Sequence, residues 1–240
     1  MGNKINFLSV VVPVFNEEGN IAPLLKEIYT TFVGNINFEI IYVNDGSTDQ
    51  TQNELIESKS VYSNLRILNH KASCGQSLAI RTGIIAAKGD WILTLDGDGQ
   101  NDPSCVNQLF DLIENGVDLI GGNRTLSRQD SFSRRSTSLV ANLIRSNLLK
   151  DSSPDSGCGL KLIRKSAFLD LPYFDHMHRF LPALIQRRGG KVISFPVNHR
   201  IRKYGKSKYG TIDRLLVGIV DLLGVLWLIK RSKIPIVLEG

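Results

Sequence analysis

The 240-residue chain has little cysteine and no leader-like N-terminus. Its three cysteines, Cys74, Cys105 and Cys158, are widely spaced, and no Cys-x-x-Cys pair is present. A disulfide framework or a structural zinc site is therefore not expected, and reduced thiols are. Residues 1–8 contain one lysine and only a short apolar run, so a signal peptide is not expected either.

The chain also lacks internal repeats, low-complexity tracts and any extreme of hydropathy. Apolar residues make up 42% of it, and the mean hydropathy is −0.04. These values exclude a disordered chain and a polytopic membrane protein, and the length allows one large domain or two small ones. Twenty-nine Lys and Arg against 23 Asp and Glu give a net charge of +6. This charge allows an anionic partner, such as nucleic acid, phosphate esters or an acidic membrane surface, without choosing among them.

Apolar runs and amphipathic segments alternate along the first hundred residues. Strands are predicted at 8–15, 38–43, 65–68 and 91–95, and helices after Asn16 as N-cap, from about 48, and at 75–87. This alternation predicts a parallel sheet with crossover helices, whose ligands bind beyond the carboxyl ends of the strands. Pro13 within the first run predicts an edge strand, a bulge or a strand end near Val12.

The second half is less regular and ends in an apolar segment. Helices are predicted at 103–115, 138–149 and 215–229, strands at 117–121, 160–163 and 192–197, and basic loops at 124–135 and 198–209. The segment 215–229 contains Asp221 and is too short to span a bilayer securely, which takes about 20 apolar residues. We expect it to lie on or dip into a membrane surface, and a buried core or dimer helix is the alternative.

Two acidic turns follow predicted strands. Asp96 and Asp98 are two positions apart in Asp-Gly-Asp-Gly-Gln, so their carboxylates can converge on a hard cation, with Gln100 as a neutral oxygen ligand. Asp45 follows the second strand in the same way. Ordinary polar turns are the alternative, because Asp and Gly are common there.

Two further patterns involve basic residues. Residues 200–209 gather Arg, Lys and Ser around Gly205, which suits a phosphate group, and a solvated loop or a nucleic-acid patch is the alternative. His176 and His178 form a His-x-His pair. We favour a role in orienting a helix over metal binding, because no further ligand pattern accompanies the pair.

Taken in order, these motifs resemble the family 2 glycosyltransferases, and within them the polyprenyl-phosphate sugar synthases of the dolichol-phosphate mannose synthase type. The resemblance runs from about residue 8 to 209. The motifs that carry it are residues 12–17, 43–47, 75–76, 96–100 with Pro103, 157–160, and Arg202-x-x-Gly205-x-Ser207-Lys208-Tyr209. It implies a GT-A fold of the α/β class, with a mostly parallel central sheet flanked by helices and a C-terminal apolar helix. We expect residues 1–210 to form the GT-A domain and residues 211–240 an amphipathic or membrane-associated helix and tail.

The resemblance also implies roles for residues on the donor side. Asp45 matches the acidic contact to the nucleotide base, and Pro13, Asn16 and Glu17 match the nucleotide-binding loop of the first strand. Asp96, Asp98 and Gln100 match the ligands of the Mg²⁺ or Mn²⁺ ion that holds the donor diphosphate.

On the acceptor side, Arg124 matches an arginine that approaches the lipid phosphate, and Arg134 and Ser138 match a pair that grips the same phosphate. Arg202, Ser207 and Lys208 lie in the loop that closes over donor and acceptor. The expected catalytic set is therefore Asp98, Arg124, Arg134 and Arg202. Because a phosphate acceptor is already ionised at neutral pH, it needs little general-base catalysis and chiefly a cationic cradle.

The implied activity is an inverting, metal-dependent transfer of a hexose from a GDP- or UDP-hexose to a polyprenyl phosphate, of the mannosyl- or glucosyltransferase type. We expect the protein at the cytoplasmic face of a membrane, peripheral or shallowly inserted, and leave a homo-oligomer open. The alternative is a family 2 enzyme acting on a sugar hydroxyl in polysaccharide or lipooligosaccharide assembly, which needs a catalytic carboxylate. A nucleic-acid partner is not expected, because aromatic residues do not interleave with the basic ones.

Overall fold

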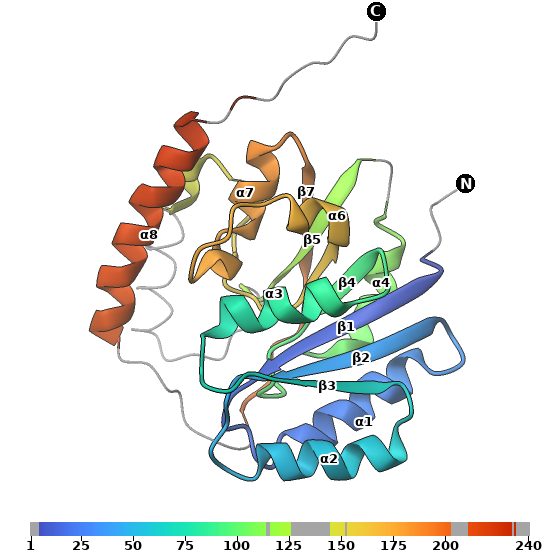
Figure 1. The fold of residues 1–240 in the computed structure, drawn as a ribbon. Coiled ribbons are helices and arrows are strands. Elements are labelled where there is room, and N and C mark those ends of the chain that lie inside the picture. The colour runs from blue at the N-terminus through green and yellow to red at the C-terminus, as the bar shows by residue number, and fades with distance from the viewer. Residues whose placement is uncertain are drawn as a thin grey trace, which may run out of the picture.

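A computed structural model describes residues 5–113, 116–125, 145–151, 153–202, 211–231 and residue 233, with side chains of the last helix described from 217 onward. A seven-stranded sheet lies at the centre, in the order β3-β2-β1-β4-β6-β5-β7, and helices cover both of its faces (Figure 1). The first half of the chain consists of β1 (Phe7–Val14), α1 (Ile21–Phe32), β2 (Asn37–Asn44), α2 (Thr51–Val61), β3 (Leu65–Asn69), α3 (Gln76–Ala86) and β4 (Trp91–Thr94).

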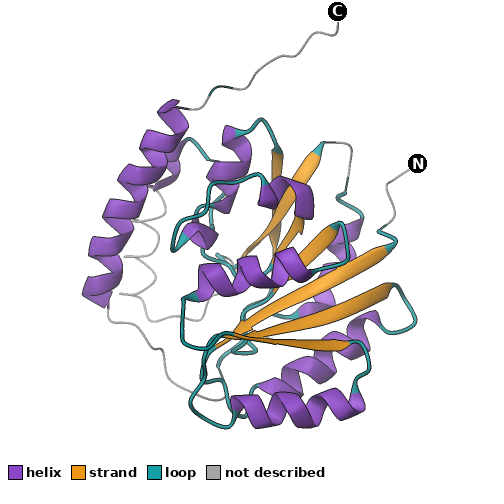
Figure 2. Ribbon diagram, in the orientation of Figure 1, coloured by secondary structure: helices purple, strands orange, loops and turns teal. Residues whose placement is uncertain are grey.

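The second half has shorter elements (Figure 2). They are η1 (Pro103–Cys105), α4 (Val106–Phe110), β5 (Val117–Asn123), β6 (Lys161–Arg164), α6 (Lys165–Leu169), η2 (Met177–Arg179), α7 (Leu181–Arg187), β7 (Lys191–Pro196) and α8 (Thr211–Arg231). Strand β6 runs antiparallel to both neighbours, β4 and β5, and every other pairing is parallel. The predicted mostly parallel α/β sheet flanked by helices is confirmed.

Alternate residues of the central strands pack into two separate cores. Val10 and Val12 of β1 face α1, α2 and α4, whereas Val11 faces α3, α6, α7 and α8. Since side chains alternate across a strand, a strand buried on both faces reads as an unbroken apolar run. This explains why residues 8–15 are apolar without a period of two.

Pro13 lies in a central strand, so the predictions of an edge strand and of a strand end near Val12 are wrong. Strand β1 continues to Val14 and pairs with β2 along its whole length. Its ladder with β4 ends at Val11, whose carbonyl accepts the last hydrogen bond from Leu95. The backbone of Pro13 faces that same side, beyond the end of β4, so its missing N–H removes no ladder bond.

One predicted helix differs in the structure, and another is described only in part. The helix predicted over 103–115 is a 3-10 turn followed by the five-residue α4. Asp102 accepts a hydrogen bond from Ser104 N, and this cap starts the turn at Pro103. Of the helix predicted over 138–149, residues 145–149 are described and are helical.

The C-terminal helix α8 lies against the body of the molecule on one side only. Val225 is buried, and Leu222, Leu226 and Leu228 pack against the core that contains Val11 and the buried residues of α7. The opposite side exposes large apolar side chains, namely Val217, Ile219, Val220, Leu223 and Trp227. Among the helices that the structure describes, none is both long enough and apolar enough to cross a bilayer. Whether 211–240 is a separate unit stays a prediction.

Candidate active site at the carboxyl edge of the sheet

The acidic turn after β4 holds two carboxylates close together. Gln76 of α3 donates from Nε2 to Asp96 Oδ1 at 2.9 Å, and Gln100 donates its backbone N–H to Asp98 Oδ1 at 3.1 Å. Burial, and then the neighbouring Asp96 carboxylate, raise the pKa of Asp98 to about 6. Two carboxylates that disfavour each other's charge are the donor set that a hard divalent cation neutralises, so this pair fits such an ion.

Glycines allow the turn to pack against its neighbours. A Cβ at Gly159 would lie 2.2 Å from Asp96 Oδ2, and a Cβ at Gly97 would lie 2.9 Å from the Pro13 carbonyl oxygen. Any side chain at these positions would displace Asp96 or separate β1 from β4. Pro13 therefore contacts the acidic turn through its backbone carbonyl, next to Gly97.

The second acidic turn, at the end of β2, has different surroundings. Asp45 is buried, and its carboxylate accepts four hydrogen bonds. The donors are His70 Nδ1 at 2.7 Å, Ser73 Oγ at 2.8 Å, and the backbone N–H groups of Cys74 and Gly75 at 2.9 Å each. Burial alone would raise the pKa of Asp45, but these hydrogen bonds hold it below its usual value. Ligand atoms of Asp45, His70 and Cys74 converge within 4.8 Å. The four donors occupy the carboxylate lone pairs that a metal would need.

The loop after β1 is joined to the loop after β2. Asn16 has a φ of 51°, its N–H donates to Ser47 Oγ at 2.9 Å, and its Oδ1 accepts from Thr48 N at 2.7 Å. This left-handed conformation ends the strand without starting a helix. The prediction that Asn16 is a helix N-cap is therefore wrong, and α1 begins at Ile21.

Glu17 and Arg202 bring this loop to the acidic turn after β4. Arg202 Nη2 lies 2.6 Å from Glu17 Oε1 and 3.9 Å from Asp98 Oδ2. A guanidinium, a carboxylate and the acidic turn thus meet although they come from three segments far apart in sequence. The resemblance assigned Glu17, Asp98 and Arg202 to three separate motifs, and the structure brings their side chains together.

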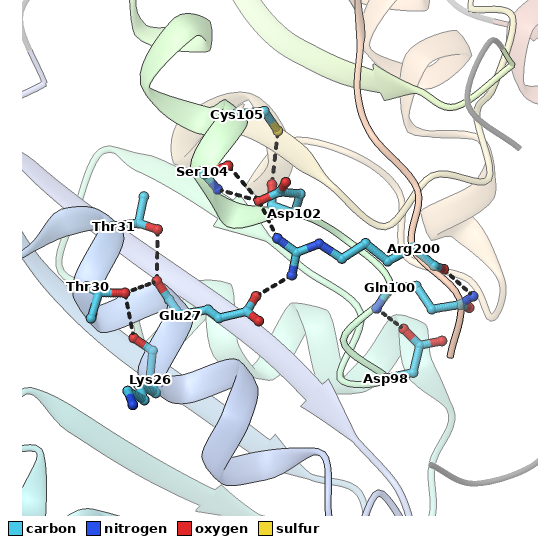
Figure 3. A network of polar contacts seen from close by, with 10 residues as sticks. All are labelled: Lys26, Glu27, Thr30, Thr31, Asp98, Gln100, Asp102, Ser104, Cys105 and Arg200. Carbon is cyan, nitrogen blue, oxygen red and sulfur yellow. Dashed lines mark hydrogen bonds and ion pairs between the residues drawn. The ribbon is translucent and has the colours of Figure 1, made fainter. Parts of the chain in front are cut away.

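The segment that precedes Arg202 runs along the acidic turn, with Arg200 beside Gln100 (Figure 3). The backbones pair through Arg200 N to Gln100 O at 3.0 Å, and Gln100 Nε2 donates to Arg200 O at 3.1 Å. The Arg200 guanidinium then bridges Glu27 of α1 at 2.6 Å and Asp102 at 2.8 Å (Figure 3). The structure uses the side-chain amide nitrogen of Gln100 to hold this segment, and a metal-ligand role for its oxygen stays a prediction.

Arg124, at the end of β5, is buried and paired. Its Nε and Nη2 donate to the two oxygens of Asp155 at 2.8 and 3.0 Å, and its backbone N–H also reaches Asp155. Arg145 makes a similar pair with Asp151. These two pairs fix the loop before β6 at Asp151 and Asp155, so Arg124 shapes the wall of the site, and its approach to a lipid phosphate stays a prediction.

A cavity opens between Asp96 and this loop. It is lined by Gln76, Ile80, Thr94, Asp96, Gly157, Gly159, Lys161, His178 and Leu181. Sequence reasoning missed Lys161, although a single charged residue in the apolar run 160–163 was a signal. It also missed Asp155 and Arg200, whose partners lie 31 and 173 residues away in sequence. Four expected site residues, Arg134, Ser138, Ser207 and Lys208, lie outside the described residues.

Comparisons with known proteins identify the family of the chain. A sequence model described as "Glycosyl transferase family 2" matches residues 9–171. The dodecaprenyl-phosphate galacturonate synthase of Rhizobium johnstonii is 34% identical over 236 residues, covering 95% of this chain and 69% of that protein. The undecaprenyl-phosphate 4-deoxy-4-formamido-L-arabinose transferase of Edwardsiella ictaluri is 34% identical over 223 residues, covering 91% and 67%.

Solved structures share the fold at low identity. A mannosyltransferase from Pyrobaculum calidifontis in complex with GDP-Man and Mn²⁺ superposes with a TM-score of 0.71 at 18% identity, and the match covers 95% of this chain and 65% of that one. The glucosyl-3-phosphoglycerate synthase of Mycobacterium tuberculosis with Mn²⁺ and UDP-glucose gives 0.67 at 20% identity, covering 96% and 80%. The chain belongs to glycosyltransferase family 2, has the GT-A fold and is a glycosyltransferase.

Proposed function

We propose that this family 2 glycosyltransferase transfers a hexose-class sugar from a nucleotide sugar to a polyprenyl phosphate, with inversion at the anomeric carbon. The observation that carries the proposal is the paired Asp96 and Asp98 carboxylates at the carboxyl end of β4, with the Arg202 guanidinium 3.9 Å from Asp98. The two curated relatives are named for transfer to dodecaprenyl or undecaprenyl phosphate. Their sugars, galacturonate and a formamido-arabinose, differ, so the mannosyl or glucosyl type rests on the sequence resemblance alone.

Asp96 and Asp98 would hold a divalent cation, Mg²⁺ or Mn²⁺. When bound, such an ion supplies a Lewis acid that stabilises the charge of a departing diphosphate. In its absence Arg202 offers Asp98 a positive charge. We infer that donor binding turns this guanidinium from Glu17 and Asp98 toward the phosphates, where it would offset the charge of the leaving group.

The acceptor phosphate is an anion that must approach a second anion, the donor diphosphate. The residues of this chain would lower that repulsion with cations, because an ionised phosphate needs no base to remove a proton. Arg124 and Arg202 lie in the described part of the site. Arg134, Ser138, Ser207 and Lys208 are proposed to complete the cradle.

The exposed face of α8 supports a membrane partner. Val220, Leu223 and Trp227 are each at least 60% exposed, and Lys230 and Arg231 follow in the last turn. An apolar stripe followed by basic residues suits a helix lying in the interface of an anionic bilayer. We propose peripheral attachment through this face at the cytoplasmic side, where a nucleotide sugar is available.

A donor and acceptor panel tests the proposal. UDP- and GDP-linked sugars, including UDP-galacturonate, are offered with undecaprenyl or dolichyl phosphate and Mn²⁺, and the lipid product is identified by mass spectrometry. We expect a sugar-phosphoryl-polyprenol and the nucleoside diphosphate. Asp98→Asn should lose the product, whereas Asp111→Asn, an exposed carboxylate outside the site, should keep it. Transfer to a sugar hydroxyl with none to a lipid phosphate would reject the proposal in favour of the polysaccharide-assembly alternative.

A further inference from the structure

Lys161 lines the cavity beside Asp96. The cavity is small, with a volume of about 60 Å³. Lys161 is the first residue of β6, and its backbone lies opposite Thr94 of β4 in the sheet register. Because β6 runs antiparallel to β4, the beginning of β6 meets the end of β4, and Lys161 joins the cavity at the edge that carries the acidic turn.

The ammonium group of Lys161 has few partners for a buried charge. Lys161 is only 3% exposed. Among the described residues its hydrogen-bond acceptor is a neutral group, the carbonyl oxygen of Cys158. An ammonium has three protons to donate, and the Asp96 and Asp155 carboxylates act on it through their charge. Burial nevertheless lowers the pKa of Lys161 below its usual value.

His178 contributes a neutral donor to the same cavity. Its Nδ1 lies 2.7 Å from Ser77 Oγ, and the same hydroxyl oxygen accepts the backbone N–H of His178 at 3.3 Å. The hydroxyl proton is therefore available for Nδ1, which leaves the ring proton on Nε2. Burial, and then the charge of Lys161, lower the pKa of His178 well below its usual value. The imidazole is thus uncharged and offers a neutral N–H to the cavity.

We propose that Lys161 is an anion-binding residue of the reaction site, whose ammonium holds a phosphate or carboxylate oxygen of a substrate in the cavity beside Asp96. The inference rests on the proposed function for the identity of that substrate. Two sources carry the required chemistry: the phosphate of the lipid acceptor and the carboxylate of a uronosyl donor. Both are oxyanions, and the cavity lies beside the carboxylate pair where the donor diphosphate is expected.

The competing explanation is a purely structural charge. In that case Lys161 would only balance Asp96 and hold the loop before β6 through the Cys158 carbonyl. A structural lysine would affect thermal stability and metal affinity but would not distinguish an anionic ligand from its neutral analogue. This difference separates the two explanations.

The experiment measures binding rather than turnover, by isothermal titration of the full chain with Mn²⁺ present. The acceptor arm compares a short-chain prenyl phosphate with the matching prenol, in the presence of UDP. The donor arm compares UDP-galacturonate with UDP-galactose. The variants are Lys161→Met, Lys161→Arg and the matched control Lys165→Met, whose ammonium also bonds backbone carbonyls but lies outside the cavity. Lys161→Gln replaces the Met variant if that protein does not fold.

We expect Lys161→Met to lower the affinity for the anionic probe of one arm by about tenfold or more. Its neutral analogue should stay within about twofold, and Lys161→Arg should retain most of the affinity. The arm that responds identifies the source of the oxyanion. Equal binding of all four probes by wild type and Lys161→Met would overturn the inference, as would a loss confined to Mn²⁺ affinity. If the wild type transfers no sugar to any polyprenyl phosphate but Lys161→Met still loses the anionic probe, the proposed function fails and the inference stands.

Discussion

The acidic turns after β2 and β4 look alike in sequence and differ in structure. Asp45 accepts four hydrogen bonds from residues 70–75, and its pKa is lowered. Asp98 accepts one backbone hydrogen bond, lies beside Asp96, and has its pKa raised. A carboxylate whose charge is balanced by its own chain holds the scaffold together. A carboxylate whose charge is poorly balanced is available for a ligand, at a cost in stability.

The largest effect expected from this contrast is on turnover. Asp98→Asn should lower kcat by about 100-fold or more, because an amide cannot replace the charge that holds a divalent cation. Initial rates with excess donor and Mn²⁺ measure it, with Asp111→Asn as the control. Turnover within a few-fold of wild type would show that the turn after β4 is not the metal-binding turn.

The next effect is on the stability of the Asp45 turn. Asp45→Ala should lower the free energy of unfolding by about 2–4 kcal/mol, because four donors in a partly buried site lose their acceptor. Urea unfolding followed by circular dichroism measures the change. Asp49→Ala is a useful comparison, since that carboxylate accepts from Thr51 N and Glu18 N at a more exposed position. An unchanged unfolding midpoint for Asp45→Ala would remove its scaffold role.

The third effect has the opposite sign. A rise of the Asp98 pKa from 3.8 to about 6 means that the ionised side chain is disfavoured in the folded protein at neutral pH. Asp98→Asn should therefore stabilise the metal-free protein at pH 7 by about 1–3 kcal/mol. Thermal unfolding in the presence of a chelator measures it. A lower melting temperature for this variant would mean that Asp98 is structurally required.

The pH dependence sharpens the same comparison. A raised folded-state pKa makes the Asp98 contribution fully present below pH 3.8 and lost as the pH rises through about 6. The lowered pKa of Asp45 makes its contribution present above its unfolded-state value and lost as the pH falls through the folded value. Metal-free Asp98→Asn should thus lose the decline in stability that is expected of metal-free wild type between pH 4 and 6. Identical profiles of melting temperature against pH would contradict this assignment.

The smallest effect concerns the segment that carries Arg202. Arg200→Gln breaks the bridge between Glu27 and Asp102, which are joined to Arg200 at 2.6 and 2.8 Å. The bridge is partly exposed, so we expect little change in stability and a several-fold rise in the KM for the donor at nearly constant kcat. Arg188→Gln, which removes an exposed pair with Asp170, is the control. A fall in kcat with unchanged KM would argue against a positioning role.

The first half of the fold was predictable because its information is local. Each strand from β1 to β4 is an apolar run of four to eight residues followed by a polar turn, and parallel pairing brings those turns to one edge. The positions of Asp45, Asp96 and Asp98 followed from that rule. The exceptions were Pro13 and Asn16. Pro13 fits inside a central strand because the ladder with β4 ends before it, and Asn16 does not cap a helix because its backbone is left-handed.

The second half depends on contacts that no local pattern encodes. Arg124 and Asp155 are 31 positions apart, and Arg200 reaches Glu27 across 173. The sequence shows that these residues are charged but does not show which of them form pairs. Arg124 was therefore interpreted only as a phosphate ligand. Gln100 likewise has the chemistry of a metal ligand, yet its amide nitrogen serves the segment beside it.

The reversed direction of β6 has a consequence for how such a site can diversify. At the edge that carries the site the chain leaves the sheet through β4 and β5 but enters it through β6, so the residues that precede β6 form this part of the wall. Arginine–aspartate pairs fasten their loop at Asp151 and Asp155, and Gly157 and Gly159, which follow these pairs, line the cavity. Substitutions between Asp155 and β6 would alter what is admitted beside Asp96 while the loops of β1 and β2 stay as they are. Changes in the short segment before β6 are thus one way in which related enzymes can acquire new substrates.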